Sequence, residues 1–157
     1  MPYSKLLVVA TAAGLCVSSA ASALTYSEPP DLTRNLAIPD PIGTVVSGAN
    51  TVSGSVVAEC EEDGEGSGIF DAVFPDGGDS FEFQVPTGAQ LTSATLTISN
   101  LSGTGVFARS FTDLKFLGTV GAGSYDILGG TPLTGTQDYQ VAPTCSAAGE
   151  TVSFDWV

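Results

Sequence analysis

The alternation of apolar and polar side chains in residues 80–85 constrains the fold of this chain most strongly. Phe81, Phe83 and Val85 alternate with polar neighbours at a period of two, which is typical of a strand with one buried face. Residues 91–98 repeat this period, with leucine and isoleucine on the buried side and threonines on the other. Both segments are therefore predicted to be strands that place one face against a core.

Short β-prone runs punctuated by glycine, asparagine and aspartate fill the rest of the chain from residue 44 onward. No window after residue 23 has a convincing helical period, and the 19 glycines suit the turns between the runs. This spacing predicts an all-β fold, an antiparallel, jelly-roll-like β-sandwich of about eight or nine strands. Most phenylalanines, including Phe107, Phe111 and Phe116, are interpreted as core residues. The further strand-like runs are residues 44–47, 51–57, 69–74, 111–117, 124–128, 136–141 and 151–156.

The N-terminal residues have the build of a secretory signal peptide. Lys5 supplies a positive charge, residues 6–17 form a short apolar run, and residues 21–23 are a small-x-small cleavage site. The apolar run is shorter than the roughly 20 residues that a membrane span needs. We therefore expect a secreted location, extracellular or periplasmic, with no membrane insertion after cleavage.

Composition divides the chain into three segments. Residues 1–23 are the predicted signal peptide, and residues 24–43 form a proline-rich extended arm or edge segment. Residues 44–157 form the predicted β-sandwich domain, and a chain of this length fits a single domain.

The exported chain is strongly acidic. The whole chain has a formal net charge of −13, and removal of Lys5 with the signal peptide lowers it to −14. The basic residues that then remain are Arg34, Arg109 and Lys115. Such a charge repels phosphate backbones and anionic lipid headgroups. Nucleic acids and membrane surfaces are therefore not expected partners.

Cysteine usage predicts one disulfide. Cys16 lies in the predicted signal peptide, which leaves Cys60 and Cys145 as a pair in an oxidising compartment. The loop that this bond closes is long, and chain entropy assigns such a loop about 4 to 5 kcal/mol of stabilisation. A redox or metal role would need CxxC spacing or histidine partners, and the sequence has neither.

The sequence offers no catalytic constellation. The chain has no histidine, which excludes a Ser-His triad and leaves zinc without imidazole ligands. A Ser-Lys pair would have to use Lys115, which lies in a strand-like run. No glycine-rich phosphate loop precedes a predicted helix. We therefore expect no enzymatic activity.

Acidic side chains are densest in a glycine-rich loop predicted over residues 59–68. Closely spaced carboxylates with glycines for sharp turns are what calcium requires, so Ca²⁺ is the one cofactor that the sequence suggests. A second turn with two aspartates would complete a site if the two loops meet at one end of the sandwich. The alternative is that these acids form a solvated surface. The candidate ligands are Glu59, Glu61, Glu62, Asp63, Asp76 and Asp79.

Three aromatic residues are candidates for stacking on sugar rings. Carbohydrate-binding sandwiches use exposed tryptophan and tyrosine for this purpose, and Trp156, Tyr125 and Tyr139 lie in or near predicted strands. The alternative for Trp156 is that it packs inward beside Phe154 and fixes the C-terminal strand.

Three segments carry a resemblance to a known family. They are an N-x-V-x-G pattern from Asn50, a D-x-F-x-F-x-V-P-x-G pattern from Asp79, and a strand that opens at Leu91. Over residues 44–99 the chain resembles the bacterial pre-peptidase C-terminal domain and related secreted domains with a PEP-CTERM sorting signal. This resemblance implies a non-catalytic, jelly-roll-like sandwich, in some members with calcium held by loop and arm carboxylates. The chain departs from the family pattern because it shows no enzyme domain ahead of the module and no PEP-CTERM tail.

These observations predict a non-catalytic secreted module for extracellular surface or matrix interaction, assisted by calcium. The expected partner is an extracellular polysaccharide or a surface protein. Two alternatives stay open at this point. The first is a carbohydrate-binding module. The second is a self-assembling structural subunit whose arm, residues 24–43, adds a strand to a neighbouring copy.

Overall fold

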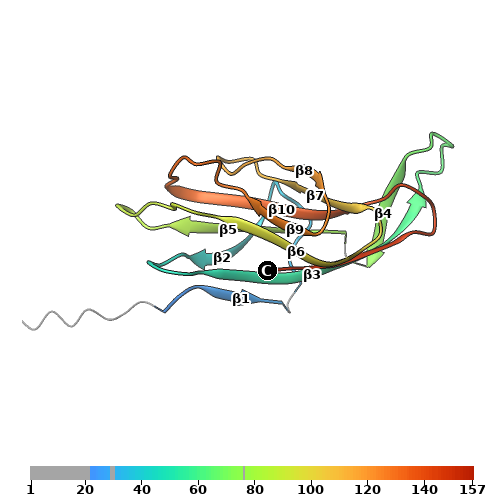
Figure 1. Ribbon diagram of the computed structural model, residues 1–157. Helices are drawn as coiled ribbons and strands as arrows, with labels where there is room; N and C mark the ends of the chain where they lie inside the picture. The colour runs from blue at the N-terminus through green and yellow to red at the C-terminus, as the bar shows by residue number, and fades with distance from the viewer. Residues whose placement is uncertain (1–21, 29–30, 76) are drawn as a thin grey trace, which may run out of the picture.

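The computed structural model describes residues 22–28, 31–75 and 77–157, which form eleven strands in two facing sheets (Figure 1). The predicted signal peptide up to residue 21, and Asp76, lie outside the described residues. The first sheet contains β1 (Thr25–Ser27), β3 (Thr51–Glu62), β11 (Thr151–Trp156), β6 (Thr95–Ser102) and β9 (Gly123–Asp126) in that order, with β4 (Phe70–Pro75) paired to β3. The second sheet contains β2 (Asp40–Thr44), β5 (Asp79–Val85), β10 (Gly135–Thr144), β7 (Gly105–Arg109) and β8 (Gly118–Val120) in that order.

Eight of these strands pair as one long hairpin rolled into a sandwich. The innermost pair is β7 with β8, and around it β6 pairs with β9, β5 with β10 and β3 with β11, all antiparallel. Successive pairs alternate between the two sheets. This nested pairing is the jelly-roll arrangement. The predicted fold class, an all-β sandwich, is therefore confirmed.

The N-terminal segment adds strands that the prediction did not include. β1 pairs with β3 and β2 pairs with β5, and both pairings are parallel. Each of these strands lies at the end of its sheet, where the missing N–H of Pro41 in β2 is tolerated. The described residues of 24–43 are therefore part of the sandwich. Together with β7 (Gly105–Arg109) and β8 (Gly118–Val120), which were also not predicted, β1 and β2 raise the count above eight or nine, and their parallel pairings make both sheets mixed.

Two predicted strands are wrong. Of residues 44–47, only Thr44 lies in a strand, as the last residue of β2. Residues 111–117 form an irregular loop after β7 instead of a strand. The start of this loop is hydrogen-bonded to a side chain and not to a neighbouring strand. Oδ1 of Asp138 on β10 accepts hydrogen bonds from the Phe111 N–H and the Ser110 hydroxyl, both at 2.8 Å. The loop is thereby fixed against the second sheet, and its phenylalanine side chains are free to face outward.

The core lies between the two sheets, as the period-two pattern predicts. Phe81 and Val85 of β5 and Ile98 of β6 are buried, whereas Phe83 is only half-buried. Burying each large apolar side chain contributes about 1.5–3 kcal/mol. The Trp156 ring stacks on Phe81 across the core, with ring centroids 5.1 Å apart and planes 5° from parallel.

The predicted disulfide is confirmed. Cys60 on β3 of the first sheet bonds to Cys145, which follows β10 of the second sheet, so the bond ties the two layers together. None of the described residues forms a helix with the length and hydrophobicity that crossing a bilayer requires.

Candidate functional site

The acids of the first predicted calcium loop lie mostly on a strand. Glu59, Glu61 and Glu62 are exposed residues of β3, whose C-terminal half pairs with β4 as a hairpin that extends beyond the sandwich (Figure 1). Asp63 begins the hairpin turn, and its Oδ2 accepts a hydrogen bond from the Ser67 hydroxyl at 2.5 Å. That hydrogen bond is the main reason why the pKa of Asp63 is lowered. Asp63 therefore stabilises the turn.

Of the two aspartates in the second predicted calcium loop, the structure describes Asp79, which is buried at the start of β5. Its Oδ2 accepts a hydrogen bond of 2.7 Å from the Trp156 Nε1–H. Among the described residues, the carboxylates that approach at metal-binding spacing are Glu28, Asp31 and Asp79, each of which offers one oxygen within 4.8 Å of the others. The structure therefore groups Asp79 with the N-terminal segment and not with the described acids of β3, because β3 carries those acids along the projecting hairpin.

Glu28 has a structural role within this acidic group. Its Oε2 accepts a hydrogen bond from the Ser55 N–H at 2.8 Å, and its Oε1 accepts one from the Leu32 N–H at 3.3 Å. Gly54 permits this approach, because a Cβ there would lie 2.7 Å from Glu28 Oε2. Glu28 therefore links the N-terminal segment to β3. Sequence reasoning missed the group because Asp79 is distant in the chain from Glu28 and Asp31, and calcium binding stays a prediction.

Two of the three predicted sugar-stacking residues are wrong. Tyr139 and Trp156 are only 1% and 2% exposed, so neither ring can contact a ligand from solvent. Burial raises the pKa of Tyr139, whose hydroxyl donates a hydrogen bond to the Lys115 carbonyl at 3.2 Å. Tyr125 is half-buried, and its hydroxyl donates a hydrogen bond to the Gly121 carbonyl at 2.9 Å. Tyr139 and Trp156 therefore support the fold, and sugar stacking by Tyr125 stays a prediction.

Among the side chains that the structure describes, the exposed aromatic rings belong to phenylalanines that the sequence assigns to the core. Phe111 is 65% exposed and Phe116 is 60% exposed, both in the loop that follows β7. Phe107 on β7 packs edge-on against Phe116, with ring centroids 5.5 Å apart. These three rings form an apolar rim on the outer face of the second sheet.

Arg109 lies among these rings, and its guanidinium is held by two of them and by a hydrogen bond to Gln140. Its Cζ lies 5.6 Å from the ring centroid of Phe107 and 5.5 Å from that of Phe111, within the range of cation–π attraction. Its Nε donates a hydrogen bond to Gln140 Oε1 at 2.7 Å. Gln140 is only 3% exposed and is itself fixed, because its Nε2 donates to Ser80 Oγ at 2.7 Å and to the Arg34 carbonyl. The structure therefore holds this arginine in a defined orientation.

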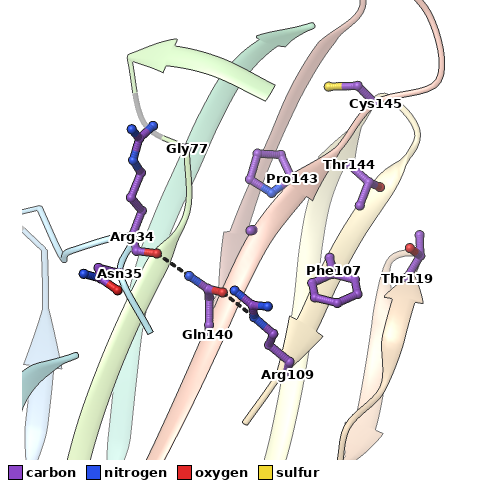
Figure 2. A pocket seen from close by; sticks show the side chains of 11 residues that line it. Arg34, Asn35, Gly77, Phe107, Arg109, Thr119, Gln140, Pro143, Thr144 and Cys145 are labelled. Carbon is purple, nitrogen blue, oxygen red and sulfur yellow. Dashed lines mark hydrogen bonds between the residues drawn. The ribbon is translucent and has the colours of Figure 1, made fainter. Parts of the chain in front are cut away.

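Arg109 and Arg34 both line one hollow on this face (Figure 2). The hollow has a volume of ≈ 850 Å³, and Gln140 lies between the two arginines. Figure 2 also shows Phe107 beside Arg109 and Asn35 beside Arg34. No acidic residue is among the described residues that line it. The two arginines of the chain thus line the same hollow, although the chain as a whole is strongly anionic.

A second hollow, of ≈ 480 Å³, lies between the sheets. It is lined by core rings such as Phe81 and Trp156 and by apolar residues such as Leu24 and Leu91. No charged side chain is among the described residues around it, so it offers space for an apolar group without a charge to orient it.

Comparison with protein-family models, with curated proteins and with solved structures found no match to this chain. The resemblance to the pre-peptidase C-terminal domain therefore stays a prediction, and the chemistry of the arginine hollow rests on its own residues.

Proposed function

We propose that this protein is a non-catalytic, secreted β-sandwich module that binds an extracellular polysaccharide. The observation that carries the proposal is the oriented guanidinium of Arg109, which shares a hollow with Arg34 on the outer face of the second sheet. Guanidinium and amide groups donate hydrogen bonds to sugar oxygens. Exposed aromatic rings such as Phe111 offer the apolar faces on which sugar rings stack.

The shape of the face favours a small unit such as a sugar over a folded protein. A hollow of ≈ 850 Å³ lies within the range of about 300–1,000 Å³ that is typical of small-molecule sites. Stable protein partners instead bury about 800 Å² of surface on each side. A polysaccharide can place one or two sugar units in the hollow while the rest of the polymer runs across the sheet.

The self-assembly alternative has less support. The segment expected to add a strand to a neighbour already pairs within its own chain, as β1 on β3 and β2 on β5. Donating either strand to another copy would first require breaking those pairings. We therefore propose no second function.

The proposal is tested with the purified exported chain on an array of extracellular polysaccharides. We expect binding to at least one polysaccharide and a loss of that binding in Phe111→Ala, which removes the most exposed ring beside Arg109. Ile69→Ala is the matched control, because it removes an exposed apolar side chain from the distant hairpin. Binding to no polysaccharide, or equal binding by Phe111→Ala, would contradict the proposal.

A further inference from the structure

The chemistry of the hollow also specifies a class of sugar, and the inference below rests on the proposed function. Only part of the Arg109 guanidinium is available to a ligand. Its Nε is bonded to Gln140, and Phe107 and Phe111 lie over its guanidinium. Its two terminal Nη groups have no hydrogen-bond acceptor among the described residues. A pair of parallel N–H donors in one plane is therefore left at the edge of the guanidinium.

Such a pair of donors matches a carboxylate better than it matches hydroxyl groups. Arginine and carboxylate form two parallel, charge-assisted hydrogen bonds, which are shorter and stronger than neutral ones. The fixed position of Gln140, which donates to Ser80 Oγ, means that little side-chain freedom is lost when this pair forms. Arg34 lines the same hollow with its guanidinium directed toward Gly77, and no acid is among the described lining residues (Figure 2). The charge of Arg109 thus favours an anion at its Nη groups.

The charge of the whole chain limits how many anionic groups the ligand can carry. Beyond a distance of about 8 Å at physiological salt, screening removes most of the attraction of Arg109. A ligand with a charge on every sugar would place its other charges beyond that distance, on a chain that after residue 23 has three basic residues against 17 acidic ones, so most of those charges would find no cation to pair with. Isolated carboxylates, separated by neutral sugars, match a single cation better.

We propose that the hollow binds a polysaccharide through the carboxylate of an isolated uronic acid residue, which pairs with the Nη groups of Arg109. The sugar rings on either side pack against the exposed phenylalanines. The ligand class is therefore a glycan in which uronic acid alternates with neutral sugar.

The experiment compares uronate-containing oligosaccharides with their carboxyl-reduced counterparts, in which each carboxylate has become a primary alcohol. Binding of the purified exported chain is measured by isothermal titration calorimetry for alternating glucuronate, galacturonate and mannuronate oligomers. We expect the acid form of at least one to bind at least about tenfold more tightly than its reduced form, because a charge-assisted pair is lost. This comparison leaves the protein unchanged, so it does not depend on how any variant folds.

Two variants assign the effect to Arg109. Arg109→Gln is expected to reduce affinity for the acid form to that of the reduced form. Lys115→Gln is the matched control, because it removes the same charge from the one basic residue of the exported chain that does not line the hollow. It is expected to change affinity by less than about twofold.

The outcomes separate failure of the inference from failure of the proposed function. Equal binding of acid and reduced forms, with binding lost in Phe111→Ala, would overturn the carboxylate assignment and leave the polysaccharide function standing. Tighter binding of a densely charged or sulfated glycan than of every alternating uronate would overturn it as well. Binding to no glycan on the array would overturn the proposed function and the inference together.

Discussion

Removal of the disulfide is the perturbation whose magnitude follows most directly from this structure. The variant is Cys60→Ala combined with Cys145→Ala, two residues 85 positions apart in the chain. The bond closes a long loop in the unfolded chain and joins the two sheets in the folded one. For a loop of this length, the chain-entropy relation gives a loss of about 4.5 kcal/mol at 25 °C. For about 130 ordered residues this corresponds to a fall of roughly 15 °C in Tm.

The assay is urea unfolding followed by the fluorescence of Trp156, which is stacked on Phe81 in the core. The double variant should also show a larger m-value, since an open unfolded chain exposes more surface than a cross-linked one. The unmutated chain in reducing agent is the control, and it should lose the same stability. A loss below about 1 kcal/mol with an unchanged m-value would refute the view that the bond acts by restricting the unfolded chain.

Three further predictions concern the core, a buried tyrosine and calcium. Ile98→Ala should lower the free energy of unfolding by about 2–5 kcal/mol, because it leaves a cavity between the sheets. A loss below about 1 kcal/mol in urea unfolding would contradict the assignment of Ile98 to the core. Burial raises the pKa of Tyr139, so its phenol keeps its proton in the folded chain. In the unfolded chain the same phenol ionises above a pH of about 10. The free energy of unfolding should therefore fall as the pH rises beyond that value. Tyr139→Phe should flatten this slope in urea titrations, and a slope equal to that of the unmutated chain would contradict it. Millimolar calcium should raise Tm where magnesium does not. Glu28→Gln should abolish that rise and Glu61→Gln should not, because the described acids at metal-binding spacing include Glu28 and not Glu61; the reverse pattern would place calcium on the hairpin.

The sequence predicted the parts of this fold that depend on local period. The alternation around Phe81 identified β5 and its buried face, and the isolated cysteine pair identified the cross-link. Proline in residues 24–43 indicated an edge segment, but local pattern could not show that its strands pair in parallel with β3 and β5. Those partners are distant in the chain, and no turn connects them directly.

The candidate site was harder to predict because long-range contacts build it. Phe111 and Phe116 look like core residues until the carboxylate of Asp138 is seen to hold their loop against β10. Arg34 and Arg109 show no relation in the sequence, and they line one hollow because β10 lies between β5 and β7 in the second sheet. The inward direction of Trp156 depends equally on a distant partner, the buried Asp79. Three acids of the predicted loop instead lie on a strand, because β3 continues to Glu62.

The central claim is that the face around Arg109 holds the ligand, and its most direct test is a map of the bound protein by nuclear magnetic resonance. The chain from residue 24 onward, labelled with ¹⁵N, would be titrated with the alternating uronate oligosaccharide that binds most tightly. We predict that the Arg109 Nε–H and Gln140 side-chain signals shift most, together with backbone amides of β7, β10 and the loop after β7. Shifts that cluster on the outer face of the first sheet, or around Tyr125, with Arg109 unchanged, would contradict the account.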